Sequence, residues 1–243
     1  MALIKKPIIA FLALLLTLAM LSGCRSIGGQ TIIDWVDFLK LNGISYTGQW
    51  SAVVTDPAQI GGEIGKVKFN VADNVHHSGY KTKEGDAAFL PKGTVVYEVN
   101  GYPDRSFVAV QDPEAYNGYR LYADDRKIRE LAASLEPDER KVSSARLYEG
   151  YTDFKLLKEL KADSASIFVA MLKRSEERQD YSPATRNGDP TAYPFVLDTG
   201  DAIGYWNIIY YDGLRYYWHD NNVKLLPGEF ASYVTNSAAG ETP

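Results

Sequence analysis

The sequence predicts a β-rich α+β protein: a small antiparallel barrel or sandwich domain, followed by a second domain of antiparallel sheet packed on a helix. Three observations predict this class. Gly and Pro interrupt short apolar runs at intervals of about 8–12 residues, as in small all-β domains. Turn-forming pairs stand between apolar runs at Asn42-Gly43 and Asp212-Gly213. Apolar residues at helical spacing are found mainly near 128–135 and 163–178.

Residues 32–123 are expected to form the barrel or sandwich domain. Its clearest element is a hairpin at Asn42-Gly43, because both central residues of a type I′ turn need a positive φ. The turn length also sets the register, in which polar and apolar residues take opposite faces of a half-buried sheet. The predicted pairs are Leu41 with Ile44, Leu39 with Tyr46, and Lys40 with Ser45.

Four more strands are expected in this domain, at 66–71, 87–90, 94–99 and 106–110. The first of them alternates polar and apolar residues, which is typical of a half-buried strand. The stretch from Phe89 to Val110 resembles the Leu-x-x-Gly-Thr-x-Val-x-Val core of bacterial Src-homology-3-like modules. That resemblance implies a small barrel.

Residues 124–141 are predicted to form a helical linker. The apolar residues behind Asp124-Asp125, which are candidate N-caps, recur at helical spacing, and Pro137 ends the pattern. These apolar residues are Ile128, Leu131, Ala132 and Leu135.

Residues 142–236 are expected to form the second domain, and 237–243 a disordered tail. Strand-like runs at 146–151 and 154–160 precede a helix that is capped at Asp163-Ser164. The side chains predicted to face inward from this helix are Ile167, Phe168, Met171 and Leu172. Residues 179–193 are expected to form an irregular loop.

The last predicted hairpin has a two-residue turn at Asp212-Gly213, between 203–211 and 214–218. The predicted pairs are Tyr211 with Leu214, Ile209 with Tyr216, and Asn207 with Trp218. In this register Tyr210, Arg215 and Tyr217 share the second face of the sheet. We therefore expect these three residues to be candidate ligand contacts, although the aromatic residues of this sheet are also what the core of a β domain requires.

The charge balance argues against a nucleic-acid-binding protein. The chain has 31 acidic and 26 basic residues, with a formal net charge of −5. Binding to phosphates needs clustered Lys and Arg, and 45% of the residues are hydrophobic, which is typical of a folded body. We expect a folded protein with no nucleic-acid partner.

The N-terminus has the pattern of a secretory signal. Lys5-Lys6 precedes an apolar run from 7 to 21, with small residues before Cys24. Leu21-Ser22-Gly23-Cys24 resembles the lipobox of bacterial lipoproteins, which implies removal of residues 1–23 and a thioether-linked lipid, with acyl chains such as palmitate, on Cys24. Residues 24–31 would form the lipidated end and tether. Because the signal carries two lysines and no acid, its removal leaves a formal charge of −7.

The sequence motifs predict no catalytic group. Asp198-Thr199-Gly200 resembles the active-site loop of retroviral-type aspartic proteases, but Asp201 follows where that family has a small residue. We interpret the stretch as a β-turn. The sequence also contains only one cysteine, Cys24, so we expect no disulfide and no Cys-based metal site.

The histidines give no clear metal-binding motif. His76 could join Asp73 and Asp86 in a weak site, but adjacent side chains such as His76 and His77 point to opposite faces of an extended chain. The third histidine, His219, is far from the other two in the sequence. We interpret the His76 region as a solvated loop and expect neither a metal nor a cofactor, and no catalytic residues are assigned.

The chain as a whole resembles the uncharacterised Bacillus-type lipoproteins. The segments that carry the resemblance are 34–38, 42–46, 64–67 and 85–90. It implies a protein that is lipid-anchored to the bacterial cell membrane on its extracytoplasmic side. We expect a non-enzymatic binding or accessory protein whose partner is an envelope protein, peptide or glycan. The alternatives are an envelope hydrolase with a scattered Asp, Glu and His site, and an inhibitory or sensory module.

Overall fold

The structure is a computed structural model that describes residues 33–151, 153–186, 188–220 and 222–235. The chain divides into two compact units, of which one comprises 1–34 with 75–80 and the other 35–74 with 81–243. In the first unit, the rings of His77 and Tyr80 meet edge to face, with centroids 6.3 Å apart. The signal, Cys24 with its tether, and the tail at 237–243 lie outside the described residues.

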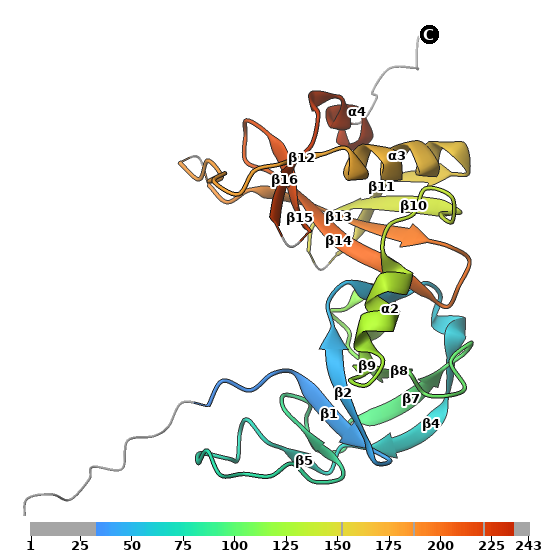
Figure 1. The fold of residues 1–243 in the computed structure, drawn as a ribbon, viewed down its shortest axis with the longest axis vertical. Coiled ribbons are helices and arrows are strands. Elements are labelled where there is room, and N and C mark those ends of the chain that lie inside the picture. The colour runs from blue at the N-terminus through green and yellow to red at the C-terminus, as the bar shows by residue number, and fades with distance from the viewer. Residues whose placement is uncertain (1–32, 152, 187, 221, 236–243) are drawn as a thin grey trace, which may run out of the picture. The chain divides into compact units, whose positions relative to one another are not determined.

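The second unit confirms the predicted β-rich α+β class (Figure 1). Its described residues form two mainly antiparallel sheets, sheet A and sheet B, with few helices. Sheet A is curled like half a barrel and runs in the order β4-β7-β8-β9-β2-β1-β6-β5. Its strands are β1 (Phe38–Leu41), β2 (Ile44–Gln49), β4 (Ile60–Lys66), β5 (Phe69–Asn70), β6 (Asp86–Ala87), β7 (Val95–Val99), β8 (Phe107–Gln111) and β9 (Tyr119–Asp124).

The β1–β2 hairpin has the predicted register. Leu41 pairs with Ile44, Leu39 with Tyr46 and Lys40 with Ser45. Asn42 and Gly43 have φ of 54° and 76°, as a type I′ turn requires. Leu39 and Tyr46 are fully buried. The turn residues and the alternation of apolar residues favour the same pairing here, so the sequence alone was sufficient to predict the register of this hairpin.

Sheet B packs one face on a helix, as predicted for the second part of the chain. The order is β11-β10-β13-β14-β15-β16-β12. The strands are β10 (Ser144–Glu149), β11 (Lys155–Lys161), β12 (Glu176–Glu177), β13 (Thr191–Asp198), β14 (Ile203–Tyr211), β15 (Tyr216–Asp220) and β16 (Asn222–Leu225). The core contains Phe168 of helix α3 (Asp163–Lys173), whose ring meets Phe195 of β13 edge to face at 5.5 Å.

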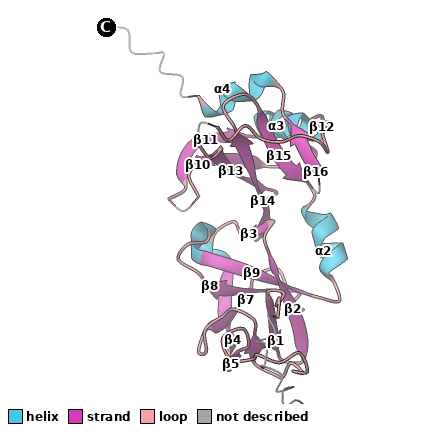
Figure 2. Ribbon diagram, turned by 90° about the vertical axis from the view of Figure 1, so that its left-hand side faces the viewer, coloured by secondary structure: helices cyan, strands magenta, loops and turns pink. Residues whose placement is uncertain are grey.

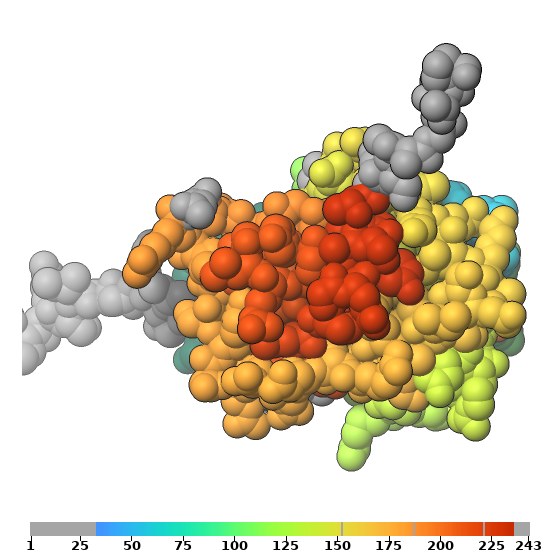
Figure 3. Space-filling view, turned by 90° about the horizontal axis from the view of Figure 1, so that it is seen from above, coloured from blue at the N-terminus to red at the C-terminus, as the bar shows by residue number. Residues whose placement is uncertain are grey.

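The C-terminal segment completes this core. It forms η3 (Gly228–Phe230) and α4 (Ala231–Val234). Phe230 is fully buried, and its ring lies 6.4 Å from that of Phe168. Figure 3 shows this segment, in red, lying against the yellow segment that contains α3.

A short strand from the first half of the chain joins sheet B. This strand, β3 (Ala52–Val54), pairs antiparallel with β14, with Val54 opposite Ile203 (Figure 2). On the outer edge of β3, the side-chain amide of Asn117, within η2 (Tyr116–Gly118), donates to the carbonyls of Val54 and Thr55. A second short turn, η1 (Pro57–Gln59), follows β3. The linker contains helix α2 (Ile128–Leu135), which ends before Pro137.

Several local predictions were wrong. The strand expected at 66–71 is interrupted after Lys66, where β4 ends, and continues only as β5, and the strand expected at 87–90 is reduced to the two-residue β6. The β14–β15 hairpin pairs Tyr211 with Tyr216, so its connection spans four residues, 212–215, and not two. Ile167 was expected to face the core, but it is 58% exposed. Helix α3 begins after Ala162, which has a φ of 45° and makes no side-chain cap bond.

Candidate functional site

The strongest candidate site is a groove of about 300 Å³ lined by six aromatic rings, which we call the aromatic groove. Its rings are Trp50, Tyr116, Tyr119, Tyr151, Phe154 and Trp206. Trp50 lies between β2 and β3, and Tyr116 and Tyr119 lie in η2 and at the start of β9. Tyr151 and Phe154 belong to the β10–β11 connection, and Trp206 belongs to β14. The polar residues in its lining are Gln49, Asp112, Glu114 and Arg120. Apolar walls with a few polar groups are typical of ligand sites.

Trp50 is the most exposed ring of the groove. It follows β2 directly, and 74% of its surface is accessible. The guanidinium of Arg120, on β9, lies 5.6 Å from the centroid of its indole. That guanidinium is fixed in turn by Asp112, at 2.5 Å, and by the buried Asp37, at 3.9 Å. A cation held over an indole face restrains the ring, so Trp50 is both accessible and positioned.

Asp37 is a buried carboxylate that supports this arrangement. It lies just before β1 and accepts hydrogen bonds from the Tyr122 hydroxyl at 3.0 and 3.2 Å. Burial raises the pKa of Asp37, and the bond from Tyr122 and the charge of Arg120 oppose that rise. Burial also raises the pKa of Tyr122, with a further contribution from Asp37. Tyr122 therefore remains a hydrogen-bond donor at neutral pH.

The inner wall of the groove is a cluster of rings around Tyr116. Its ring lies 5.8 Å from both Phe154 and Trp206, and these two are 5.6 Å apart. The hydroxyl groups of Tyr116 and Tyr148 are hydrogen-bonded at 2.9 Å. Phe154 has a φ of 41°, which is unusual for an aromatic residue. The surrounding rings hold it there, and strained residues of this kind are frequent at binding sites.

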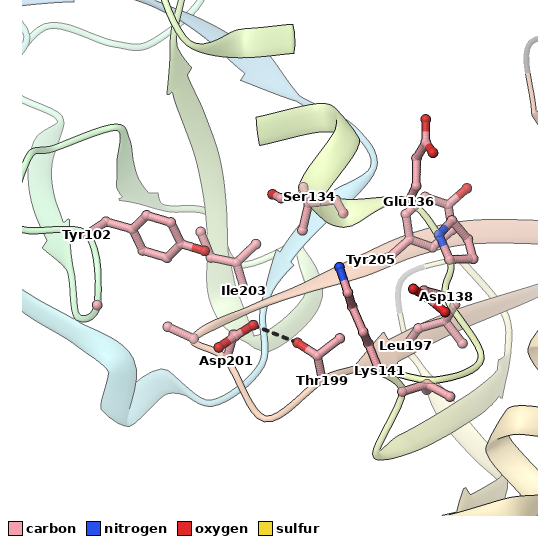
Figure 4. Close-up of a pocket in the computed structure, with 15 residues that line it drawn as sticks. Tyr102, Ser134, Glu136, Asp138, Lys141, Leu197, Thr199, Asp201, Ile203 and Tyr205 are labelled. Carbon is pink, nitrogen blue, oxygen red and sulfur yellow. Dashed lines mark hydrogen bonds between the residues drawn. The ribbon is translucent and has the colours of Figure 1, made fainter. Parts of the chain in front are cut away.

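A second hollow of about 330 Å³, which we call the linker cleft, lies between the C-terminal end of α2 and the β13–β14 turn (Figure 4). Its charged lining residues are Glu136, Asp138, Lys141 and Asp201. In Figure 4 the amine of Lys141 points into the hollow, with Asp138 and Asp201 on either side in that view. The linker cleft thus has three carboxylates in its lining, those of Glu136, Asp138 and Asp201.

Two of these carboxylates, those of Asp138 and Asp201, already accept hydrogen bonds within the protein. Asp138 accepts hydrogen bonds from the backbone and guanidinium of Arg140, which lower its pKa. Asp201 accepts a bond of 2.9 Å from Thr199. Burial raises the pKa of Tyr102 in the lining, and the charge of Asp201 adds to that rise. Neither histidine nor cysteine is in the lining of the cleft.

The three ligand contacts predicted from the sequence do not converge. Tyr210 and Tyr217 do stack, with centroids 5.4 Å apart and planes at 21°, but Tyr217 is only 4% exposed. Arg215 lies in the β14–β15 connection and lines a different hollow, beside Met171 and Arg174. The reason is the four-residue connection, which leaves Arg215 outside the ladder.

Tyr210 nevertheless lies near the aromatic groove. Burial raises its pKa to about 12, and the charge of Tyr151 and a hydrogen bond with it add to the shift. Since Tyr151 is 54% exposed and lines the groove, Tyr210 extends the aromatic surface along β14. The sequence therefore placed one of its three candidates beside the site that the fold assembles.

The other motifs have simple structural roles. Asp198-Thr199-Gly200 forms the turn between β13 and β14, as predicted, with Gly200 N–H donating to the Asp198 carboxylate at 2.7 Å. In the part of the chain that the structure describes, no group of three His, Cys, Asp or Glu side chains is arranged to hold a metal ion. Cys24, the predicted lipidation site, lies outside the described residues. Among the helices described, none has both the length and the apolar character needed to cross a bilayer.

Comparisons with protein-family models, with curated proteins and with solved structures found no match.

Sequence reasoning missed Trp50 and the ring cluster around Tyr116. Trp50, Tyr116 and Trp206 come together only because β3 pairs with β14. One signal was available. A tryptophan at the polar end of a predicted strand, followed by Ser51, has no apolar neighbours to bury it, and such a residue is more informative than one within an apolar run.

Proposed function

We propose that this chain is a non-enzymatic binding protein of a bacterial cell envelope, anchored to the extracytoplasmic face of the membrane through lipidated Cys24. The anchor is supported by the lipobox-like Leu21-Ser22-Gly23-Cys24. The binding role is supported by one observation above the others: Trp50 is exposed and at the same time restrained by Arg120, at the rim of a groove lined by rings. Aromatic residues in such positions dominate recognition surfaces.

The full-length protein in detergent is expected to be retained by isolated envelope material, and Trp50→Ala to weaken that retention about tenfold. A loss of about 1.4 kcal/mol gives that factor, which is within the range that truncation of a tryptophan contact costs at recognition surfaces. The measurement is the bound fraction as a function of protein concentration.

Leu214→Ala is the matched control, since Leu214 is 78% exposed and lies outside the groove. The fold of each variant is checked by circular dichroism. Equal retention of wild type and Trp50→Ala would contradict a binding role for the groove.

The second candidate function is an envelope hydrolase, and the linker cleft is the observation that favours it. Asp201 and Asp138 line one hollow with Lys141. If the cleft were catalytic, envelope material incubated with the protein would release reducing ends or primary amines, and Asp201→Asn would abolish this release. Asp180→Asn, in an exposed loop, is the control. No release above background by the wild-type protein would reject the hydrolase.

A further inference from the structure

We propose that the aromatic groove binds a neutral saccharide, with one sugar ring packed on the indole of Trp50. This inference rests on the proposed binding function and names the chemical class of the ligand. The rings of the groove, its polar groups, its charge and its backbone edge all favour this class of ligand.

The exposed rings of the groove provide apolar surface that is accessible before any ligand arrives. A pyranose ring has a face of C–H groups that packs on an aromatic face, and its hydroxyl groups remain at the ring edge. Trp50 is fixed by Arg120, so little side-chain freedom is lost when a ring packs on it. Tyr151 is also exposed, and Trp206 is half-buried in the same groove. A rigid ring platform of this kind matches a rigid ring ligand.

The polar residues in the lining suit hydroxyl groups. Asp112 and Glu114 offer carboxylate acceptors, Arg120 offers N–H donors, and Gln49 offers an amide. The backbone N–H of Glu114 donates to the Asp112 carboxylate at 3.1 Å, which fixes that carboxylate in addition to its bond from Arg120. Hydroxyl groups both donate and accept, so they can use both kinds of partner at the groove.

The charge of the groove disfavours an anionic ligand. Arg120, the cation in its lining, is shared between Asp112 and the buried Asp37. Glu114 adds a further negative charge, and the whole chain is acidic, with a formal charge of −5. A phosphate, sulfate or acidic polymer would meet no uncompensated cation here. A neutral ligand does not incur this repulsion.

The backbone at the groove disfavours an extended peptide. Peptides that bind as an added strand need an unpaired strand edge. One edge of β3 pairs with β14, and on the other edge the carbonyls of Val54 and Thr55 accept hydrogen bonds from Asn117. The groove therefore offers rings and side-chain polar groups, whereas the carbonyls at the C-terminal end of β3 already accept hydrogen bonds from the chain itself.

The test is isothermal titration calorimetry of the full-length protein in detergent with cellotetraose, chitotetraose and maltotetraose. At least one of these neutral saccharides is expected to bind saturably. Trp50→Ala is expected to weaken that binding about tenfold, Trp50→Phe to retain most of it because a ring remains, and Leu214→Ala to leave it unchanged. No binding of any of the three, or binding that is unaffected by Trp50→Ala, would overturn the inference.

Envelope capture separates this inference from the function on which it rests. If capture depends on Trp50 but is abolished by protease treatment of the envelope, and the three saccharides do not bind, then the ligand is a protein or peptide; the saccharide inference fails and the binding function stands. If neither the envelope nor the saccharides are bound, both proposals fail. Capture that resists protease and is competed by a saccharide supports both.

Discussion

Asp212 organises the β14–β15 connection through its carboxylate. One carboxylate oxygen accepts from the backbone N–H groups of Leu214 and Arg215, both at 2.9 Å. The other accepts from the Tyr181 hydroxyl at 2.5 Å and from Ala184 N–H at 2.9 Å. Burial acts to raise the pKa of Asp212, but these hydrogen bonds outweigh it and lower the pKa to about 2. A single side chain thus ties the hairpin to the loop that precedes β13.

Asp212→Ala is expected to lower the free energy of unfolding by about 2–3 kcal/mol at pH 7, because four partly buried hydrogen bonds lose their charged acceptor. The carboxylate binds protons less readily in the folded state, so its stabilising contribution is present above its unfolded pKa of about 3.9 and is lost as the pH falls toward about 2. Urea unfolding of wild type and variant at pH 7 and pH 3 measures both effects. The difference between them should shrink at the lower pH, and a constant difference would contradict this account.

Asp212→Asn is the matched variant for the charge. Its side-chain oxygen can still accept from Leu214 and Arg215, but it carries no charge. Its stability at pH 7 should therefore lie between that of wild type and that of Asp212→Ala, and its amide should not contribute to the acid dependence.

At the scale of elements, the two hairpins show what decides a register. In the β1–β2 hairpin, Asn42-Gly43 sets a two-residue turn, and the pairs predicted from it are confirmed. Asp212-Gly213 carries the same signal, and Gly213 does have a positive φ of 92°. There, however, the Asp212 carboxylate accepts from the backbone N–H groups of Leu214 and Arg215, and the connection widens to four residues. Hydrogen bonding by a side chain to the local backbone thus outweighed the dipeptide preference.

Helix α3 shows the same limit of local patterns. Phe168, Met171 and Leu172 were correctly placed in the core, because they recur at helical spacing. Ile167 precedes Phe168 directly and is exposed. Adjacent positions on a helix differ by about 100°, so an apolar run can extend beyond the width of the buried face. Only the packing against sheet B showed where that face ends.

At the scale of the whole molecule, the predicted anchor and the folded body are separate in the chain. The predicted signal, Cys24 and the predicted tether occupy residues 1–31, whereas the core clusters of the described residues are built from residues 39–230. A lipid on Cys24 would therefore hold the protein at the membrane without contributing to its core. Stable attachment takes about two acyl chains, which a diacylglyceryl group supplies.

Cys24→Ala is expected to move the protein out of the washed membrane fraction, with no change in its unfolding midpoint. The measurement is fractionation of cells that produce either form, with mass spectrometry of the N-terminus and a thermal melt of each purified protein. Wild-type protein with an uncleaved, unmodified N-terminus in the cytosol would contradict the anchor. A lower midpoint in Cys24→Ala would contradict the separation of anchor and core.

The sequence by itself determined the β-rich class, the β1–β2 hairpin, the linker helix before Pro137 and the helix that covers sheet B. These features depend on periodicity and turn chemistry within short segments, so they can be predicted from local sequence patterns. The tertiary structure alone decided the site. Trp50 and Trp206 are far apart in the chain and line one groove because β3 pairs with β14. Such a long-range pairing depends on the packing of the whole unit, and it cannot be predicted from any short stretch of sequence.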